Sequence, residues 1–307
     1  MRVVDILFNP AIFGTLALFF AALWMLKNPN DKTRPLLVFA LVLNLFYGVL
    51  FTILMDREGS FFPWKFDHVL FHMDESLGLQ TAVIAGRLQG AWHIPLWAVY
   101  ESMVPMMICW FLVTRYRNAR GSVVLAYVAE LAAGPLMYTI VPACGPIYLF
   151  GAQWLHPPIP PVNIIRLSGM PNSFPSLHVA TAFVFVLFAP GKLWRAVSLV
   201  FLTATCMATL STGEHYVIDL IPGITFGTFA ASVGLKKYRR ALVFLGVTGC
   251  WSVGVRLGYP FLIEHPMVTR SCAALTLLFA AWAVGKEWSV HSEPASNSVV
   301  AAEALTP

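Results

Sequence analysis

Long apolar runs separated by short polar connections occupy most of this chain. A membrane-crossing helix takes roughly 17–25 mostly apolar residues, and these runs are continuous, whereas the strands of a membrane barrel would alternate. The pattern therefore predicts an all-α fold, a polytopic transmembrane helical bundle of about nine spans. The predicted spans are Ile12–Leu26, Leu36–Met55, Ile94–Val113, Val123–Val141, Leu177–Ala189, Ala196–Ser211, Tyr216–Leu235, Ala241–Leu257 and Met267–Gly285.

Two connections are longer than the others. From Asp56 to His93, apolar residues recur at helical spacing in a segment too charged to cross a membrane, which predicts an interfacial amphipathic helix. From Pro142 to Ser176, prolines are too frequent for a regular helix, and we expect an ordered, proline-rich extracytoplasmic cap over a pocket. The predicted segments are N-terminal membrane helices with the interfacial helix (1–93), a central membrane domain (94–235), two additional membrane helices (236–288) and a disordered tail (289–307).

The composition excludes a soluble protein. Of the residues, 58% are hydrophobic and only 11% are charged, with a mean hydropathy of +0.71, whereas a soluble domain is about 25% charged. The five cysteines form no CxxC pair and four of them fall within predicted spans. We interpret them as small buried side chains and expect neither a metal site nor a cofactor.

The basic residues indicate an orientation. Alternate connections carry 13 of the 20 Lys and Arg residues, and the positive-inside rule places these connections in the cytoplasm. We expect the N-terminus outside and the C-terminus inside, and the short loops and compact tail favour a bacterial inner membrane. The net charge of +5 follows from this bias and requires no nucleic acid, so the expected partners are membrane lipids. The residues concerned are Lys27, Lys32, Arg34, Arg115, Arg117, Arg120, Lys192, Arg195, Lys236, Lys237, Arg239, Arg240 and Lys286.

Two polar clusters interrupt the apolar pattern of the central domain. They are Phe174-Pro175-Ser176-Leu177-His178 and Glu214-His215-Tyr216-Val217-Ile218-Asp219. The stretch between them is almost all apolar and has the length of one helical hairpin, with a turn at 190–192. Both clusters should therefore lie on the same, extracytoplasmic face of the membrane.

The first cluster predicts the start of a helix. Asn172, Ser173 and Ser176 are capping residues, which places His178 in the first turn. Free backbone N–H groups and the helix dipole attract a phosphate there, and His178 can donate a proton to a leaving alkoxide. Alone, it would be interpreted as a core or interfacial histidine with a satisfied hydrogen bond.

The second cluster places a carboxylate beside a histidine. His215 and Asp219 are four residues apart and stack on one side of a helix. If Asp219 accepts a proton from one imidazole nitrogen, the other nitrogen becomes a nucleophile. The alternative is a buried structural carboxylate, which the histidine at i−4 makes the weaker interpretation. Glu101 and Glu130 also lie in predicted spans, where carboxylates are costly; we favour neutral or hydrogen-bonded helix contacts for both.

Together the two clusters resemble the type 2 phosphatidic acid phosphatase superfamily, and most closely its branch with the inositol phosphorylceramide synthases. Pro142-Ala143-Cys144-Gly145-Pro146-Ile147-Tyr148 is similar to the proline-aromatic element of that branch. The resemblance covers about Ile94 to Leu235. It implies that the central domain holds the catalytic helices of a phosphatase or phosphotransferase.

The resemblance also implies residue roles. His215 would attack phosphorus and form a phosphoenzyme, and Asp219 would orient and stabilise it. His178 would protonate the leaving group and then deprotonate the acceptor. No metal is implied. The candidate substrate-binding residues are Ser176, Arg166, Ser173 and Tyr216.

The chain departs from the superfamily pattern in its basic residues. The superfamily's Lys-x6-Arg-Pro motif has no counterpart, because residues 121–165 contain neither Lys nor Arg, and Ala208 and Thr209 stand where it has a Ser-Arg pair. A phosphoryl group in transfer needs charge compensation. Arg166 in the cap is the best local substitute, with a solvated loop arginine as the equal alternative. The inositol phosphorylceramide branch tends to lack these groups, which favours that branch.

The function that these patterns favour is a membrane-embedded lipid phosphatase or phosphotransferase. It would act on a lipid phosphate or phospholipid head group at the extracytoplasmic face, with transfer to an alcohol slightly favoured because an aromatic cap would exclude water. One alternative is hydrolysis with water as the acceptor. Others are a metal-binding triad of two histidines and Asp219 and a non-catalytic lipid-binding protein or a transporter, although no inverted repeat is evident.

Overall fold

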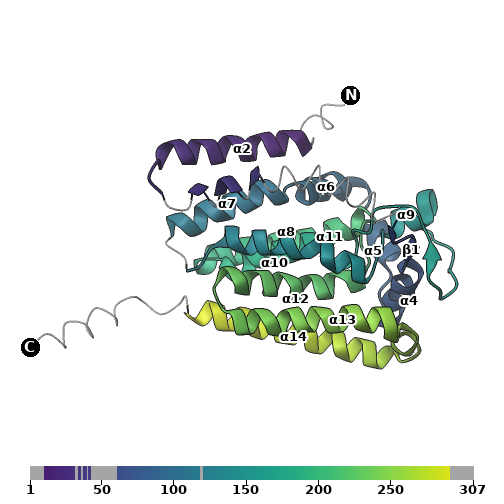
Figure 1. Ribbon diagram of the computed structural model, residues 1–307. Coiled ribbons are helices and arrows are strands. Elements are labelled where there is room, and N and C mark those ends of the chain that lie inside the picture. Colours follow the sequence, from purple (N-terminus) through teal and green to yellow (C-terminus); the bar gives the residue numbers. More distant parts are fainter. Residues whose placement is uncertain are drawn as a thin grey trace, which may run out of the picture.

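The computed structural model describes residues 10–31, 34–35, 37–39, 41–42, 61–117 and 120–290. Figure 1 shows α8, α10, α12, α13 and α14 side by side, with α2 on one flank and the short elements α4, α5, α9 and β1 gathered at one end. The elements are α2 (Pro10–Lys27), β1 (Trp64–Lys65), α4 (Asp67–Leu77), α5 (Thr81–Leu88), η1 (Gly90–Trp92), α6 (His93–Glu101), α7 (Met103–Tyr116), α8 (Val123–Ile140), α9 (Pro146–Phe150), η2 (Gly151–Gln153), β2 (Ile165–Arg166), α10 (Leu177–Phe188), α11 (Gly191–Ser211), α12 (Val217–Gly234), α13 (Tyr238–Glu264) and α14 (Pro266–Val290).

Among the described residues, five helices are long and apolar enough to cross a membrane: α8, α11, α12, α13 and α14. The run from η1 and α6 through α7 makes a sixth candidate, bent by 59° at a break between α6 and α7. The all-helical membrane fold is therefore confirmed, but nine spans are not. The predicted span at 12–26 coincides with α2, and that at 36–55 lies largely outside the described residues.

Helix α10 is shorter than a membrane span and lies inside the bundle. Its 12 residues cover about 18 Å, against a hydrocarbon core of about 30 Å. It contacts α7, α8, α11, α12 and α14, and all its side chains from Val179 to Phe188 are buried. The amino end of α10, where His178 lies, is therefore surrounded by other helices.

Two glycines let α12 approach α10 closely. A Cβ atom at Gly227 would lie 2.4 Å from the Ala180 carbonyl oxygen, and one at Gly223 would lie 2.7 Å from that of Ser176. Small residues at such contacts are the usual means of packing helices where lipid supplies no hydrophobic driving force. This contact holds the two helices that carry the candidate catalytic residues.

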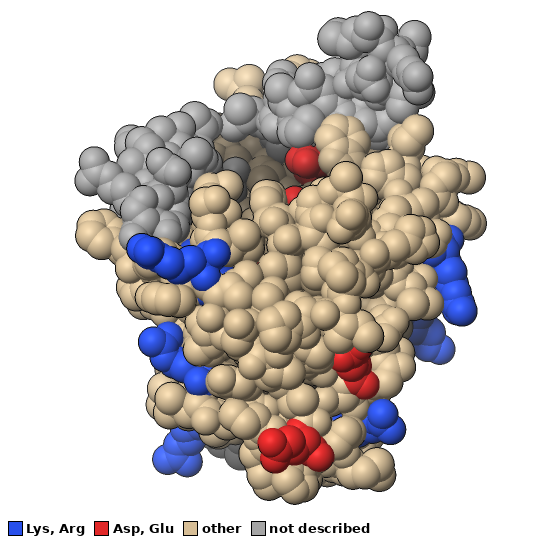
Figure 2. Space-filling model, turned by 90° about the vertical axis from the view of Figure 1, so that its right-hand side faces the viewer, with Lys and Arg blue, Asp and Glu red and all other residues tan. Residues whose placement is uncertain are grey.

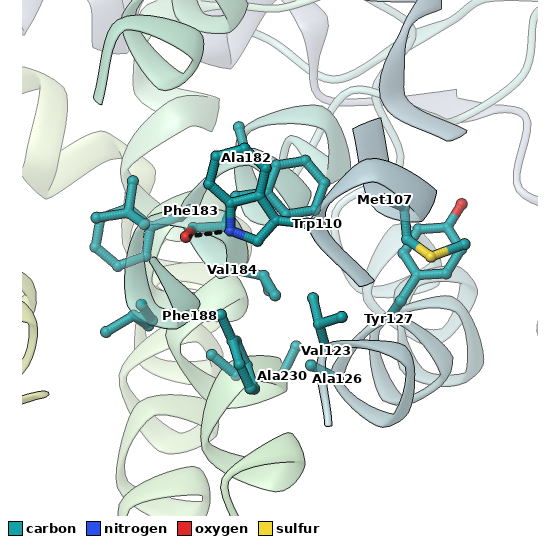
Figure 3. Close-up of a cluster of buried hydrophobic side chains, with 14 of the residues drawn as sticks. Met107, Trp110, Val123, Ala126, Tyr127, Ala182, Phe183, Val184, Phe188 and Ala230 are labelled. Atoms are coloured by element: carbon teal, nitrogen blue, oxygen red, sulfur yellow. Dashed lines mark hydrogen bonds between the residues drawn. The ribbon is translucent and has the colours of Figure 1, made fainter. Parts of the chain in front are cut away.

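The apolar centre of the bundle also fixes α10 from the other side. Figure 3 shows Trp110 of α7 beside the residues of α10, with its indole N–H directed at the Phe185 carbonyl oxygen at 2.9 Å. The Trp110 and Phe185 rings stack with their centroids 5.2 Å apart. A buried indole needs such a partner because an unpaired donor in an apolar core is costly.

The two long connections are more structured than the sequence pattern indicates. The segment predicted as one interfacial helix contains α4 and α5, separated at Gly78, which has a φ of 77°. Helix α4 packs against α12, α13 and α14. In the proline-rich connection, α9 contacts α4, and β2 pairs antiparallel with β1, with Ile165 opposite Lys65.

The α10–α12 contact makes a stability prediction. We expect Gly227→Ala to lower the free energy of unfolding by about 1–3 kcal/mol, because the added methyl group must force apart two backbones. Gly246→Ala is the matched control, since nothing lies within 4 Å of a Cβ at that position of α13. Thermal unfolding in detergent measures both; equal melting temperatures for the two variants would contradict the close contact.

Candidate functional site

The two polar clusters meet at the end of the bundle that carries α4 and α9. The Ser176 backbone N–H donates to the Asp219 carbonyl oxygen at 3.2 Å. The rings of His178 and His215 have centroids 6.1 Å apart, with their planes 71° from parallel. The hairpin of α10 and α11 thus returns the chain to the membrane face from which α10 starts.

The hydrogen bonds of His215 define its free nitrogen. Nδ1 lies 2.8 Å from the Ser173 carbonyl oxygen, which can only accept, so Nδ1 carries the proton. Nε2 then has a lone pair and lies 3.4 Å from Ser176 Oγ. The His215 side chain is 2% exposed. When the ring is neutral, this hydrogen bond fixes the tautomer that leaves the lone pair on Nε2, the arrangement that a nucleophile requires.

Asp219 acts on His215 at slightly longer range than a hydrogen bond. Its Oδ2 lies 3.6 Å from His215 Nδ1, an ion-pair distance but too long for a good hydrogen bond. The same oxygen accepts from Ser173 Oγ and, at 2.8 Å, from the Tyr216 backbone N–H. Asp219 therefore holds the two segments on either side of His215, and its charge faces the imidazole. The sequence predicts that Asp219 accepts a proton from His215, but in the structure the Ser173 carbonyl oxygen accepts the Nδ1 proton instead.

His178 is held by an aromatic neighbour. Its ring stacks on Tyr100 of α6, with centroids 3.9 Å apart and planes 21° from parallel. Ser176 caps α10, accepting from the Val179 N–H at 3.4 Å, so that His178 lies in the first turn as the sequence predicts. The His178 and His215 rings are in a T-shaped arrangement.

Two buried aspartates of α4, Asp67 and Asp74, accept hydrogen bonds from the backbone around the site. The sequence pattern did not indicate either of them. Asp74 accepts from the Val217 and Ile218 N–H groups, at 3.0 Å and 2.8 Å, at the start of α12. Asp67 accepts from the Cys144 and Gly145 N–H groups. The only sequence signal was a pair of aspartates seven residues apart, two helical turns, in an otherwise amphipathic segment.

The proline-aromatic element touches the nucleophile loop directly. The Ile147 N–H donates to the Gly213 carbonyl oxygen at 3.0 Å. Gly145 has a φ of 105°, and a Cβ there would lie 2.4 Å from the Glu214 carbonyl oxygen. Only glycine fits this approach. The element thus forms a wall of the site.

The four predicted substrate-binding residues take different places. Ser173 and Ser176 are buried against Asp219 and His215. Tyr216 is fully buried and donates its hydroxyl to Asp67 Oδ1 at 3.2 Å, so we assign it a supporting position. Arg166 is exposed in β2, with its guanidinium over the Trp64 ring. No described contact joins Arg166 to the two histidines.

A family model described as the PAP2 superfamily matches residues 68–233, more than half of the chain. The chain belongs to the PAP2 superfamily. Members are phosphatases and phosphotransferases, so this chain is an enzyme of that general kind, and its apolar helices make it a membrane protein. The comparison with curated proteins found no match, nor did that with solved structures.

The PAP2 match begins in α4, earlier than the resemblance predicted from the sequence. This start agrees with the contacts of Asp67 and Asp74, which make α4 part of the site's framework. The finer assignment to the inositol phosphorylceramide branch is not confirmed.

The charge around this PAP2 site is acidic among the described residues. Figure 2 views this end of the molecule and shows a hollow with acidic atoms inside it. Glu214 precedes His215 and accepts from Tyr148 Oη at 3.1 Å, and burial raises the pKa of Glu214 above its ordinary value. Glu101 lies close enough for the two carboxylates to repel each other.

Three described basic side chains at this end bond to backbone carbonyl groups rather than to the site. Lys65 donates to the Phe62 carbonyl oxygen, Arg256 to that of Ile140 and Arg270 to that of Ser76. Within the described residues, no three His, Cys, Asp or Glu side chains converge as metal ligands would. The metal-binding triad considered from the sequence therefore gains no support from the geometry.

Asp74 makes a prediction about activity. We expect Asp74→Ala to lower kcat at least tenfold, because it removes the acceptor of the Val217 and Ile218 N–H groups at the start of α12 and displaces His215. Losing such a buried acceptor costs about 1–3 kcal/mol. Glu75→Gln is the control, since Glu75 is on the same helix and bonds to His72. Turnover of a lipid phosphate measures both, and equal rates would contradict the role of Asp74.

The same aspartates predict how stability depends on pH. Burial raises the pKa of Asp67 to about 6 and that of Asp74 to about 8, from ordinary values of 3.8, although their N–H donors oppose the shift. The folded state therefore binds these protons more tightly, and the stability they contribute is lost as pH rises through the folded pKa values. We expect the melting temperature in detergent to fall between pH 5 and pH 8. The fall should be smaller in Asp74→Asn; an unchanged slope would contradict this assignment.

Proposed function

We propose that this enzyme transfers a phosphoryl group, or a phosphate-containing head group, from a membrane lipid to an alcohol through a phosphohistidine at His215. The observation that carries the proposal is the tautomer of His215. With Nδ1–H committed to the Ser173 carbonyl, Nε2 is the free nitrogen, and His178 faces it across the site.

The residues support a two-step reaction. Nε2 of His215 attacks phosphorus, the bond from phosphorus to the lipid oxygen breaks, and His178 gives a proton to that oxygen. His178 then takes a proton from the acceptor hydroxyl, whose oxygen attacks phosphorus and breaks the P–N bond. The positive charge that His215 gains in the first step is stabilised by the buried carboxylate of Asp219 and by the Ser173 carbonyl.

Two features favour an alcohol over water as the acceptor. His215 is almost fully buried, and Trp154 and Ile147 pack against Gly213 in the loop that carries it. Burial of the histidine that carries the phosphoryl group limits the access of water to the phosphoenzyme. Hydrolysis, which would make the protein a lipid phosphate phosphatase, is the second candidate. A non-catalytic lipid-binding protein or a transporter is the remaining alternative.

The proposed location is the extracytoplasmic face of a bacterial inner membrane, with the N-terminus outside and the C-terminus in the cytoplasm. Helices α10 and α12 both start at the site, so their other ends lie at the opposite end of the bundle. Lys192 follows the end of α10. The end of α12 is followed by four basic residues, Lys236, Lys237, Arg239 and Arg240. The positive-inside rule places that end in the cytoplasm.

Phosphoenzyme trapping tests the proposal. We expect lipids labelled at the phosphate to give an acid-labile, base-stable protein label that is lost in His215→Ala and kept in His265→Ala, an exposed histidine at the same end. A parallel sample with EDTA tests for a metal requirement, and added alcohols separate transfer from hydrolysis. Absence of both label and lipid turnover would favour the binding or transport alternatives.

A further inference from the structure

His178 also lines a cavity inside the bundle. The cavity has a volume of about 210 Å³ and is lined by residues of α6, α7, α8 and α10. Its lining includes His178, Asn172 and, from α8, Tyr127 and Glu130. The proposed mechanism uses only His178 of these residues, so the cavity needs its own explanation.

Glu130 is an incompletely paired carboxyl group in this cavity. It is 1% exposed, and its Oε1 accepts from Thr181 Oγ at 2.7 Å. Its Oε2 is buried and has no hydrogen-bond partner among the described residues. A carboxyl group inside a membrane protein is costly unless another group compensates it. None of the described lining residues is a lysine or an arginine, so Oε2 is left to pair with a ligand that enters the cavity.

Three tyrosine rings surround the same space. Tyr100 comes from α6, and Tyr127 and Tyr138 come from α8. Aromatic faces attract alkylammonium groups, and a cage of such rings is the usual site for a quaternary ammonium ligand. Met103 and Leu131 complete an apolar wall suited to methyl or methylene groups.

The position of Glu130 fits a ligand whose phosphate lies at the catalytic histidines and whose nitrogen lies in the cavity. Thr181, which bonds to Glu130, follows His178 by three residues on α10, so the carboxyl group lies about one helical turn, roughly 5 Å, deeper than the catalytic histidine. In an aminoalcohol phosphodiester, two methylene-type carbons separate the ester oxygen on phosphorus from the nitrogen. The phosphate can therefore lie between His178 and His215 while the nitrogen enters the cavity.

The charge of the site agrees with such a substrate. Glu214 precedes His215 in the chain and Glu101 lies near Glu214, and no described contact joins either carboxyl group to a basic side chain. A phosphate monoester with two negative charges would be repelled. A phosphodiester that carries its own ammonium group brings one negative charge and a compensating positive one.

We propose that the cavity of Tyr100, Tyr127, Tyr138 and Glu130 binds the ammonium group of a zwitterionic phospholipid, which makes an aminoalcohol phosphate the group transferred. This inference rests on the proposed function. In the first step the P–N bond to His215 forms and the bond to the lipid oxygen breaks, with His178 supplying the proton. The aminoalcohol phosphate stays on His215 with its ammonium group beside Glu130.

Lipid binding to a variant that cannot form the phosphoenzyme tests this inference separately from the proposed reaction. In His215→Ala, we expect short-chain phosphatidylcholine or phosphatidylethanolamine to quench tryptophan fluorescence at concentrations at least tenfold lower than phosphatidylglycerol or phosphatidylinositol of equal chain length. A head-group preference without any phosphoenzyme in the unmodified protein would retain the cavity's assignment and reject the proposed function. Equal affinities, or tighter binding of phosphatidylinositol, would overturn the inference.

Substitutions in the same His215→Ala background test which residues cause the head-group preference. Glu130→Gln should weaken the ammonium-bearing lipids at least tenfold and leave phosphatidylglycerol unchanged, and the unchanged lipid reports a folded protein. Tyr127→Phe should keep the preference and Tyr127→Leu should lose it, because the aromatic ring, which Tyr and Phe share, attracts the cation. Glu264→Gln, an exposed carboxylate at the end of α13, is the control. Equal weakening of all four lipids by Glu130→Gln would overturn the assignment.

Discussion

The close contact between α10 and α12 is the constraint on which the rest of the structure depends. Gly223 and Gly227 let the two backbones approach, and at the site end Ser176 donates its N–H to the Asp219 carbonyl oxygen. His178 lies in the first turn of α10 and His215 lies two residues before α12, so the distance between the helices sets the distance between the rings. Without this contact the two halves of the site would be separate polar groups in a membrane protein, each costly and neither reactive.

Buried carboxylates hold the backbone around that contact. Asp219 bridges Ser173 and Tyr216, Asp74 receives the first N–H groups of α12, and Asp67 receives those of the proline-aromatic element. Each accepts from groups that would otherwise be unpaired in a dry region, and this offsets part of the cost of burial. The arrangement keeps the loop of His215 rigid. It also explains why a connection outside the membrane spans belongs to the superfamily match.

The same arrangement makes the site unusual in charge. Among the described residues, Asp219 and Glu214 lie beside His215, and the arginine expected to help, Arg166, lies over the Trp64 ring instead. Charge compensation for a transferring phosphate must then come from the capped start of α10, from His178 and from the substrate itself. A substrate with an internal cation satisfies that requirement, and the tyrosine cavity beside His178 provides a place for it.

The sequence by itself determined the helical membrane class, the two polar clusters and their placement on one face, because hydropathy and helical periodicity are local properties of the chain. It also indicated His178 in a first helical turn and Asp219 beside His215. Only the tertiary structure decided the partner of His215, the roles of Asp67 and Asp74, the separation of Arg166 from the site and the grouping of tyrosines around Glu130. These depend on contacts between segments far apart in sequence, such as Asp74 with Ile218. No local pattern encodes such a contact, because it exists only once the helices have packed.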